Sequence, residues 1–111
     1  VTMRIGVRFG GAAGADEAAL VQEGFDPPAD VAAVARFGVA PARPGHGIGC
    51  ACCVPRGPAA LALTELFLGR ARGTLPDFAA VVVVADTNGE AAVRTALETD
   101  ILLRARFFAL D

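Results

Sequence analysis

The stretch FAAVVVVA at residues 78–85 decides how this chain folds. Its four consecutive valines form an unbroken β-branched run, which is typical of a strand buried on both faces. A strand is buried on both faces when it lies inside a mainly parallel sheet that is covered by other segments. The stretch therefore predicts an α/β protein, in which the segments on either side alternate between strands and helices.

The flanking segments show this alternation. Residues 2–9 alternate apolar and polar side chains with the period of a strand, and the Gly57-Pro58 pair and Gly73 bracket a helical pattern. We expect strands at residues 2–9, 31–37, 78–85 and 106–110, and helices at residues 16–23, 58–72 and 90–103. This order predicts one domain over residues 1–111, a small three-layer sandwich with a mainly parallel four-stranded sheet. Ligands of such sheets bind at the carboxyl ends of the strands, here after Phe9, Phe37 and Ala85.

The composition excludes several classes of function. The 111 residues include no lysine, serine, tryptophan or tyrosine, and the net charge is −2. The charge argues against a nucleic-acid partner, and the missing serine removes every serine-nucleophile mechanism. The 54% apolar content, with a mean hydropathy of +0.51, argues against disorder.

Membrane and export signals are also missing. The longest charge-free apolar stretch, residues 78–85, is far shorter than the about 20 residues that span a bilayer. No basic segment followed by an apolar one opens the chain, so we expect a cytoplasmic protein without a signal peptide.

Three cysteines form the most distinctive string, GCACC at residues 49–53. The spacing of Cys50 and Cys52 lets two thiolates chelate one soft ion such as zinc. Cys53 and His46, the only histidine, lie close by in the same glycine-rich segment. A tetrahedral site formed by Cys50, Cys52, Cys53 and His46 is therefore a candidate, as is a site of two thiolates completed by an outside ligand.

The same cysteines have two other interpretations. Free cysteines pack like small apolar residues, so they can simply be buried beside a helix. A vicinal or C-x-C pair can also form a strained disulfide and act in redox chemistry.

Residues 11–18, GAAGADEA, lie where a phosphate-binding loop of the form G-x-x-x-x-G-K-[ST] would lie. The leading glycine is present, but Asp16 replaces the second glycine, Glu17 the lysine and Ala18 the hydroxyl residue. Two carboxylates would face a triphosphate where a cation is needed, so this loop should not bind a nucleotide triphosphate.

In their order along the chain, these segments resemble the nucleotide-binding half of the CobW family of metallochaperone GTPases. The segment GAAGADEAAL (11–20) corresponds to the family's phosphate loop G-F-L-G-A-G-K-T-T-L, and ARFG (35–38) corresponds to its N-E-F-G stretch. GCACC (49–53) matches its G-C-x-C-C signature, and VPRGP (54–58) corresponds to its V-R-G-D-L segment. VVVVADTNG (81–89) corresponds to its strand that runs into E-T-T-G. The signature is intact, and the other segments support it by their order.

The resemblance implies a P-loop NTPase-like fold and a single CobW-like degenerate G domain. That domain is truncated, because the chain ends where the family's guanine-recognising strand would begin. It also implies that the cysteine loop binds zinc or another divalent transition metal. The replaced phosphate-loop residues predict that the chain is not an enzyme and binds no nucleotide. Asp86 matches an acidic position that could hold a magnesium-bound water in a relative, and we interpret it instead as a helix cap.

Two functions follow as expectations. The first is a nucleotide-incompetent, CobW-like metal-binding protein that carries or senses a transition metal. The alternative is a pseudo-GTPase interaction module with no metal role, for which an exposed apolar sheet edge would be the sign. The partners expected are a second copy of the chain or a larger CobW-like protein, with no nucleic acid and no membrane.

Overall fold

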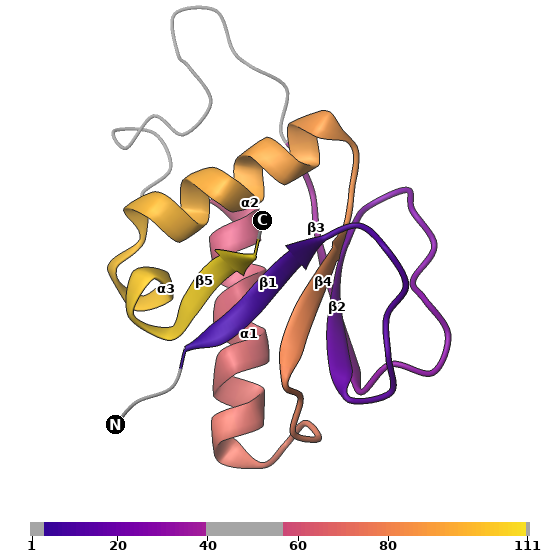
Figure 1. Ribbon diagram of the computed structural model, residues 1–111. Coiled ribbons are helices and arrows are strands. Elements are labelled where there is room, and N and C mark those ends of the chain that lie inside the picture. Colours follow the sequence, from indigo (N-terminus) through magenta and orange to yellow (C-terminus); the bar gives the residue numbers. More distant parts are fainter. Residues whose placement is uncertain (1–3, 40–56, 111) are drawn as a thin grey trace, which may run out of the picture.

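The computed structural model describes residues 4–39 and 57–110 of the chain (Figure 1). Within them it contains strands β1 (Ile5–Phe9), β2 (Glu17–Gln22), β3 (Ala33–Phe37), β4 (Ala80–Val84) and β5 (Phe107–Leu110), and helices α1 (Pro58–Arg72), α2 (Thr87–Thr99) and α3 (Ile101–Arg106). No helix in these two ranges is long and apolar enough to cross a membrane.

The five strands form one parallel sheet in the order β3-β2-β4-β1-β5. The predicted α/β class and the predicted central strand are therefore confirmed, because β4 lies in the middle and Val81, Val82 and Val83 are fully buried. The expected number of strands is wrong, since the sheet has five rather than four.

The additional strand is β2, which replaces the helix expected at residues 16–23. Alanine and acidic residues favour a helix in isolation, but this segment pairs with β3 on one side and β4 on the other. Its inner residues Ala18, Ala19, Leu20 and Val21 are all fully buried. Small side chains fit a strand with both faces covered, so tertiary pairing decides the structure here over intrinsic propensity.

All three helices pack on one face of the sheet, which we call the helical face. The side chains that point to it from the strands form one apolar cluster with helix residues such as Leu63, Leu66, Val93 and Leu103. The strand members of that cluster are Ile5, Val7, Ala18, Leu20, Ala33, Ala35, Phe37, Val81, Val83 and Phe107.

The opposite face, which carries Arg8, Val82 and Arg36 and which we call the loop face, is covered without helices. The β1–β2 connection crosses it, because Arg8 donates a hydrogen bond to the carbonyl of Ala12. The β2–β3 connection does the same, because Arg36 donates to the carbonyl of Phe25. In the described residues, the expected third layer is therefore made of irregular chain.

The strand order explains this arrangement. From β1 to β3 the chain moves across the sheet in one direction, and from β3 to β5 it moves back in the other. Connections between parallel strands are almost always right-handed, so the two sets of connections fall on opposite faces. The helices belong to the second set only.

Helix α1 has the predicted bounds. Gly57 precedes it in an extended conformation, Pro58 begins it, and Gly73 ends it with a φ of 78°. A left-handed φ of this kind is open to glycine at little cost, which is why the helix stops there. Ala60, Leu63 and Leu66 of this helix are buried, and Phe67 is partly buried against the same core.

The helix expected at residues 90–103 is two helices instead. Asp100 ends α2 and caps α3 by accepting hydrogen bonds from the backbone N–H groups of Leu102 and Leu103. The break redirects the chain, so Ile101 leaves the stripe on which Val93 and Leu97 are buried and is 85% exposed. An uninterrupted helical period could not reveal this break.

Candidate functional site

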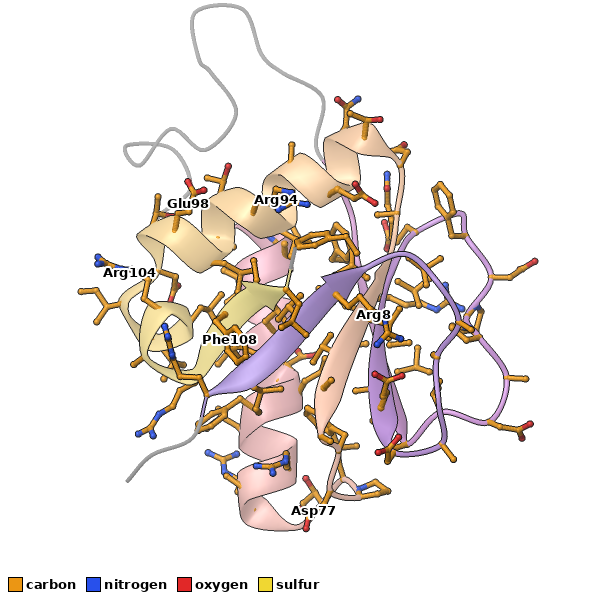
Figure 2. All side chains as sticks on the ribbon, in the orientation of Figure 1. Arg8, Asp77, Arg94, Glu98, Arg104 and Phe108 are labelled. Atoms are coloured by element: carbon orange, nitrogen blue, oxygen red, sulfur yellow. The ribbon has the colours of Figure 1, made fainter. Side chains whose placement is uncertain are left out.

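The carboxyl ends of the strands form the edge at which parallel α/β sheets bind ligands. At this edge β1 and β4 are neighbours. The loop that follows β1 at Phe9 turns toward the loop face, and α2, which follows β4, packs on the helical face. The N–H of Gly10 donates to the carbonyl of Val83 at 3.0 Å and ties the two ends together. The fold thus defines a candidate site at this edge, beside Arg94 in Figure 2.

The predicted metal ligands Cys50, Cys52, Cys53 and His46 lie outside the described residues. The described parts of the chain contain no group of three or more histidine, cysteine, aspartate or glutamate side chains that could hold a metal ion.

Both described ends of the segment between residues 39 and 57 lie on the carboxyl side of the sheet. β3 finishes at Phe37, at its carboxyl end. α1 finishes on the amino side, since Arg70 near its C-terminus donates to the carbonyl of Phe78 at 3.0 Å, just before β4 begins. The first residue of α1, Pro58, therefore lies at the other end of a 15-residue helix, on the carboxyl side.

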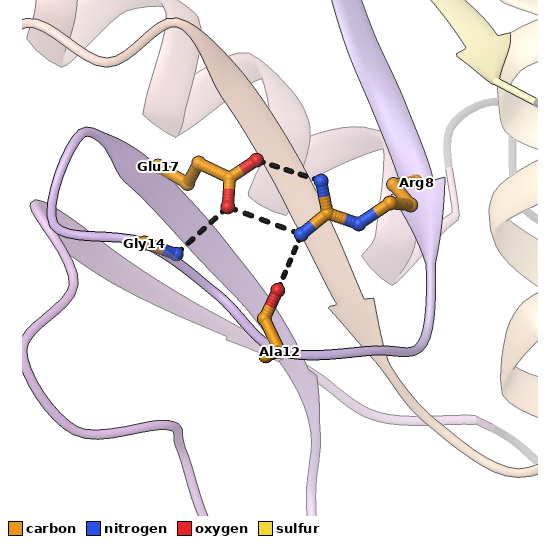
Figure 3. Close-up of polar contacts among 4 residues, drawn as sticks. All are labelled: Arg8, Ala12, Gly14 and Glu17. Carbon is orange, nitrogen blue, oxygen red and sulfur yellow. Dashed lines mark hydrogen bonds and ion pairs between the residues drawn. The ribbon is translucent and has the colours of Figure 1, made fainter.

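The loop that resembles a phosphate loop joins two strands rather than a strand and a helix. Figure 3 shows the side chain of Glu17 held by Arg8 through two contacts, of 2.9 and 3.1 Å. The backbone N–H of Gly14 donates to the same carboxylate at 2.8 Å, and Arg8 also donates to the carbonyl of Ala12. These four contacts fix the β1–β2 connection against the loop face.

The ion pair sets the charge state of both partners. The hydrogen bond from Arg8 holds the pKa of the Glu17 carboxyl below its usual value, and the Gly14 N–H adds to the effect. The pKa of Arg8 is raised, chiefly by the hydrogen bond to Glu17. Glu17 is therefore a charged structural residue near neutral pH, and its negative charge is compensated locally.

The β1–β2 connection lacks the features by which a phosphate loop binds its ligand. Phosphate loops bind through backbone N–H groups at a helix N-terminus and a lysine. No helix follows the loop here, because Ala18 lies inside β2. The N–H of Gly14 and the guanidinium of Arg8 are both engaged by Glu17.

Asp86 caps α2, as the sequence predicts. Its Oδ1 accepts from the backbone N–H of Gly89 at 2.8 Å. Its Oδ2 accepts from the side-chain amide of Gln22 at 3.3 Å, and its own N–H donates to the Gln22 carbonyl oxygen at 3.0 Å. The aspartate thus joins the ends of β2 and β4 to the start of α2.

The sequence reasoning missed Gln22 because its role depends on the strand order. Its residue number places it 64 positions from Asp86, and only the pairing of β2 with β4 brings the two together. The one sequence signal is Gly89, because a Cβ there would lie 2.2 Å from the Gln22 amide oxygen. A glycine inside a helix start that has a good cap indicates close approach of another group.

Arg94 also lies at this edge and was not a predicted site residue. It projects from α2 so that its guanidinium carbon is 3.9 Å from the ring centroid of Phe9, the last residue of β1. A guanidinium over an aromatic face is a favourable arrangement, and it fixes α2 against the end of β1.

No protein-family model matches the chain, and comparison with curated proteins and with solved structures finds no match either.

Proposed function

We propose that this chain is a nucleotide-incompetent, CobW-like protein that binds zinc or another divalent transition metal through Cys50, Cys52 and Cys53, with His46 as a further ligand. One observation carries the proposal: the segment that holds the GCACC string leaves from the end of β3 and returns at the start of α1, both on the ligand-binding side of the sheet. Loops that join these two positions are where parallel α/β proteins keep their ligand-binding residues.

The chemistry of the donor set supports a metal of the zinc type. Thiolate and imidazole ligands suit zinc, copper(I) and related ions, and they do not suit magnesium or calcium. The described residues hold no competing group of ligands, so the ion would depend on the cysteine segment. A bound ion supplies cross-linking of that segment and a deprotonated state of its thiols.

The ion pair between Glu17 and Arg8 supports the proposal that the chain does not bind or hydrolyse a nucleotide. A phosphate would have to displace the Glu17 carboxylate from Arg8 and from the Gly14 N–H before it met any cation. We therefore propose a metal-binding protein in which the metal is not coupled to GTP, and no catalytic residue is assigned.

Metal stoichiometry tests the proposal. Reduced protein, incubated with excess Zn²⁺ and then dialysed, should retain about one equivalent, as measured by elemental analysis. The Cys50→Ala/Cys52→Ala variant should retain almost none while its circular dichroism stays native, since β3 and α1 are held by their own core contacts. Retention below about 0.2 equivalents by the wild type, or equal retention by the variant, would contradict the proposal.

An interaction module without a metal role is favoured by a separate observation. β5 lies at the end of the strand order, and its residues Phe108 and Leu110 are 36% and 41% exposed. An apolar sheet edge of this kind is a docking surface for another chain. Under this alternative, removal of the thiols leaves both folding and partner binding unchanged.

A further inference from the structure

A groove of about 540 Å³ lies beside β5. Three consecutive residues of β5, from Phe107 to Ala109, form one wall, and side chains of α2 and α3 form the other. Figure 2 shows Arg94, Glu98 and Arg104 on these two helices. Phe108 pairs with Gly6 and points to the loop face, so the groove extends around the edge of the sheet.

The strand in this groove has an edge that can accept another strand. β5 pairs with β1 on one side, and no strand among the described residues pairs with its other side. On such an edge, alternate residues present backbone N–H and C=O groups outward. The sequence of β5, FFAL, has none of the charged residues or prolines with which exposed edges usually prevent pairing.

The charge of the groove is positive although the chain is acidic overall. The described residues that line it include Arg94 and Arg104 on the helical face and Arg4 on the loop face, against one acidic side chain, Glu98. The guanidinium of Arg4 lies over the ring of Phe108 at 5.5 Å from its centroid, so cation and apolar surface are presented together. Ile101, which is 85% exposed, adds a second apolar contact.

A second copy of this chain is a poor occupant. A second copy carries the same excess of arginine among the described residues of this groove, and like charges across an interface oppose association. The complementary occupant is an acidic extended segment. Its backbone would pair with β5, while its side chains would alternate between the groove and the opposite side of the sheet.

We propose that the outer edge of β5 binds an extended acidic segment of another protein, which adds to the sheet as a sixth strand. Acidic side chains of that segment, on the helical face, contact Arg104, and the alternate apolar side chains, on the loop face, contact Phe108. The proposal is independent of the metal-binding function, because it uses no residue of the cysteine segment.

A peptide titration tests this interaction. The probe is a fluorescein-labelled, capped hexapeptide of alternating glutamate and valine, followed by fluorescence anisotropy, and an unlabelled copy is titrated into ¹⁵N-labelled protein. The amide resonances of β5 should shift, and their hydrogen exchange should slow, because outward N–H groups gain acceptors. A peptide of the same sequence with N-methylated backbone amides should bind at least tenfold more weakly.

Two exposed arginines offer a matched pair of variants. Arg104 and Arg72 each lie in the last turn of a helix, α3 and α1. Arg104→Gln should weaken peptide binding about threefold, as expected for an exposed ion pair. Arg72→Gln should leave the affinity unchanged, because Arg72 is not part of the groove.

Three results would overturn the proposal. One is equal binding of a lysine–valine peptide, since the charge of the groove would then play no part. Another is a set of shifted resonances that excludes β5. The third is a dimer in light scattering whose formation protects the β5 amides, because the edge would then belong to a second copy.

Discussion

Gly89 has no room for a side chain, because the amide of Gln22 fills the space beside its Cα. A Cβ at this position would lie 2.2 Å from the Gln22 Oε1 and 2.7 Å from the Cβ of Ala85. Gln22 cannot move aside without losing its two hydrogen bonds to Asp86. The lack of a side chain at Gly89 therefore lets the start of α2 pack closely against the ends of β2 and β4.

Gly89→Ala should lower the free energy of unfolding by about 1–3 kcal/mol, as overpacking does, although alanine is the better helix former. Urea-induced unfolding followed by circular dichroism measures the change. Asn88→Ala is the control, because Asn88 is exposed in the same helical turn and its replacement should change stability by less than about 0.5 kcal/mol. Equal effects of the two substitutions would show that the clamp does not constrain Gly89.

Glu17 makes stability depend on pH in one direction. The hydrogen bond from Arg8 lowers the pKa of Glu17 in the folded protein below its ordinary value of 4.5. The contribution of Glu17 to the free energy of unfolding is therefore complete above the pKa of the unfolded chain, and it is lost as the pH falls through the pKa of the folded protein. Wild-type protein should therefore exceed Glu17→Gln in stability at pH 7, and the difference should shrink toward pH 3. Urea midpoints at both pH values measure it.

Glu65→Gln, on the exposed side of α1, is the control for this charge removal. A constant difference between wild type and Glu17→Gln at the two pH values would contradict a role for the ionised carboxylate.

At the level of elements, the α2–α3 break depends on one cap. Asp100 accepts hydrogen bonds from the N–H groups of Leu102 and Leu103 at 3.0 and 3.2 Å, and these would otherwise lack partners within the helix. The cap turns α3 so that Leu103 is fully buried in the core. α3 then leads directly into β5, so the cap also positions the edge strand.

Asp100→Ala should lower the free energy of unfolding by about 1 kcal/mol, the usual effect of losing an N-cap. Chemical unfolding measures the change, and amide hydrogen exchange at Leu102 and Leu103 should become faster. Thr99→Ala is the adjacent control, because the Thr99 hydroxyl donates to the carbonyl of Thr95 within its own helix. Unchanged exchange at the two leucines would exclude the capping role.

At the scale of the whole molecule, the sheet has a core on its helical face and a thinner cover on its loop face. Val82 points to the loop face and is nevertheless fully buried. Val34 points to the same face from the outer strand β3 and is 44% exposed. The irregular connections therefore close the centre of that face and leave its margin open.

The same substitution at these two valines tests that arrangement. Val82→Thr should lower the free energy of unfolding by about 1–3 kcal/mol, because the hydroxyl is buried away from water. Val34→Thr should change it by less than about 0.5 kcal/mol. Thermal or urea unfolding separates the two, and equal effects would mean that the loop face is open to water at its centre.

Part of this fold could be predicted because the signals were local. The valines of β4 required burial on both faces, and Gly57, Pro58 and Gly73 marked the bounds of α1. The segment of β2 could not be assigned in the same way. Its alanines favour a helix, and only the slot between β3 and β4 makes it a strand.

The candidate site divides in the same manner. Asp86 was identified as a cap from its place before a helical pattern, and the structure confirms it. Gln22 and Arg94 could not be found, since each meets its partner only through the strand order or helix packing. The metal ligands Cys50, Cys52, Cys53 and His46 stay a prediction from spacing and residue type.

The sequence by itself determined the α/β class, the central strand and the bounds of α1, because residue type and periodicity act over a few positions. Only the tertiary structure decided that the loop before β2 leads into a strand and that Glu17 pairs with Arg8. It also decided that β5 is the last of the described strands in the sheet order, beside Arg94 and Arg104. These features depend on which strands become neighbours, and that choice is made by burial of the whole sheet rather than by any local segment.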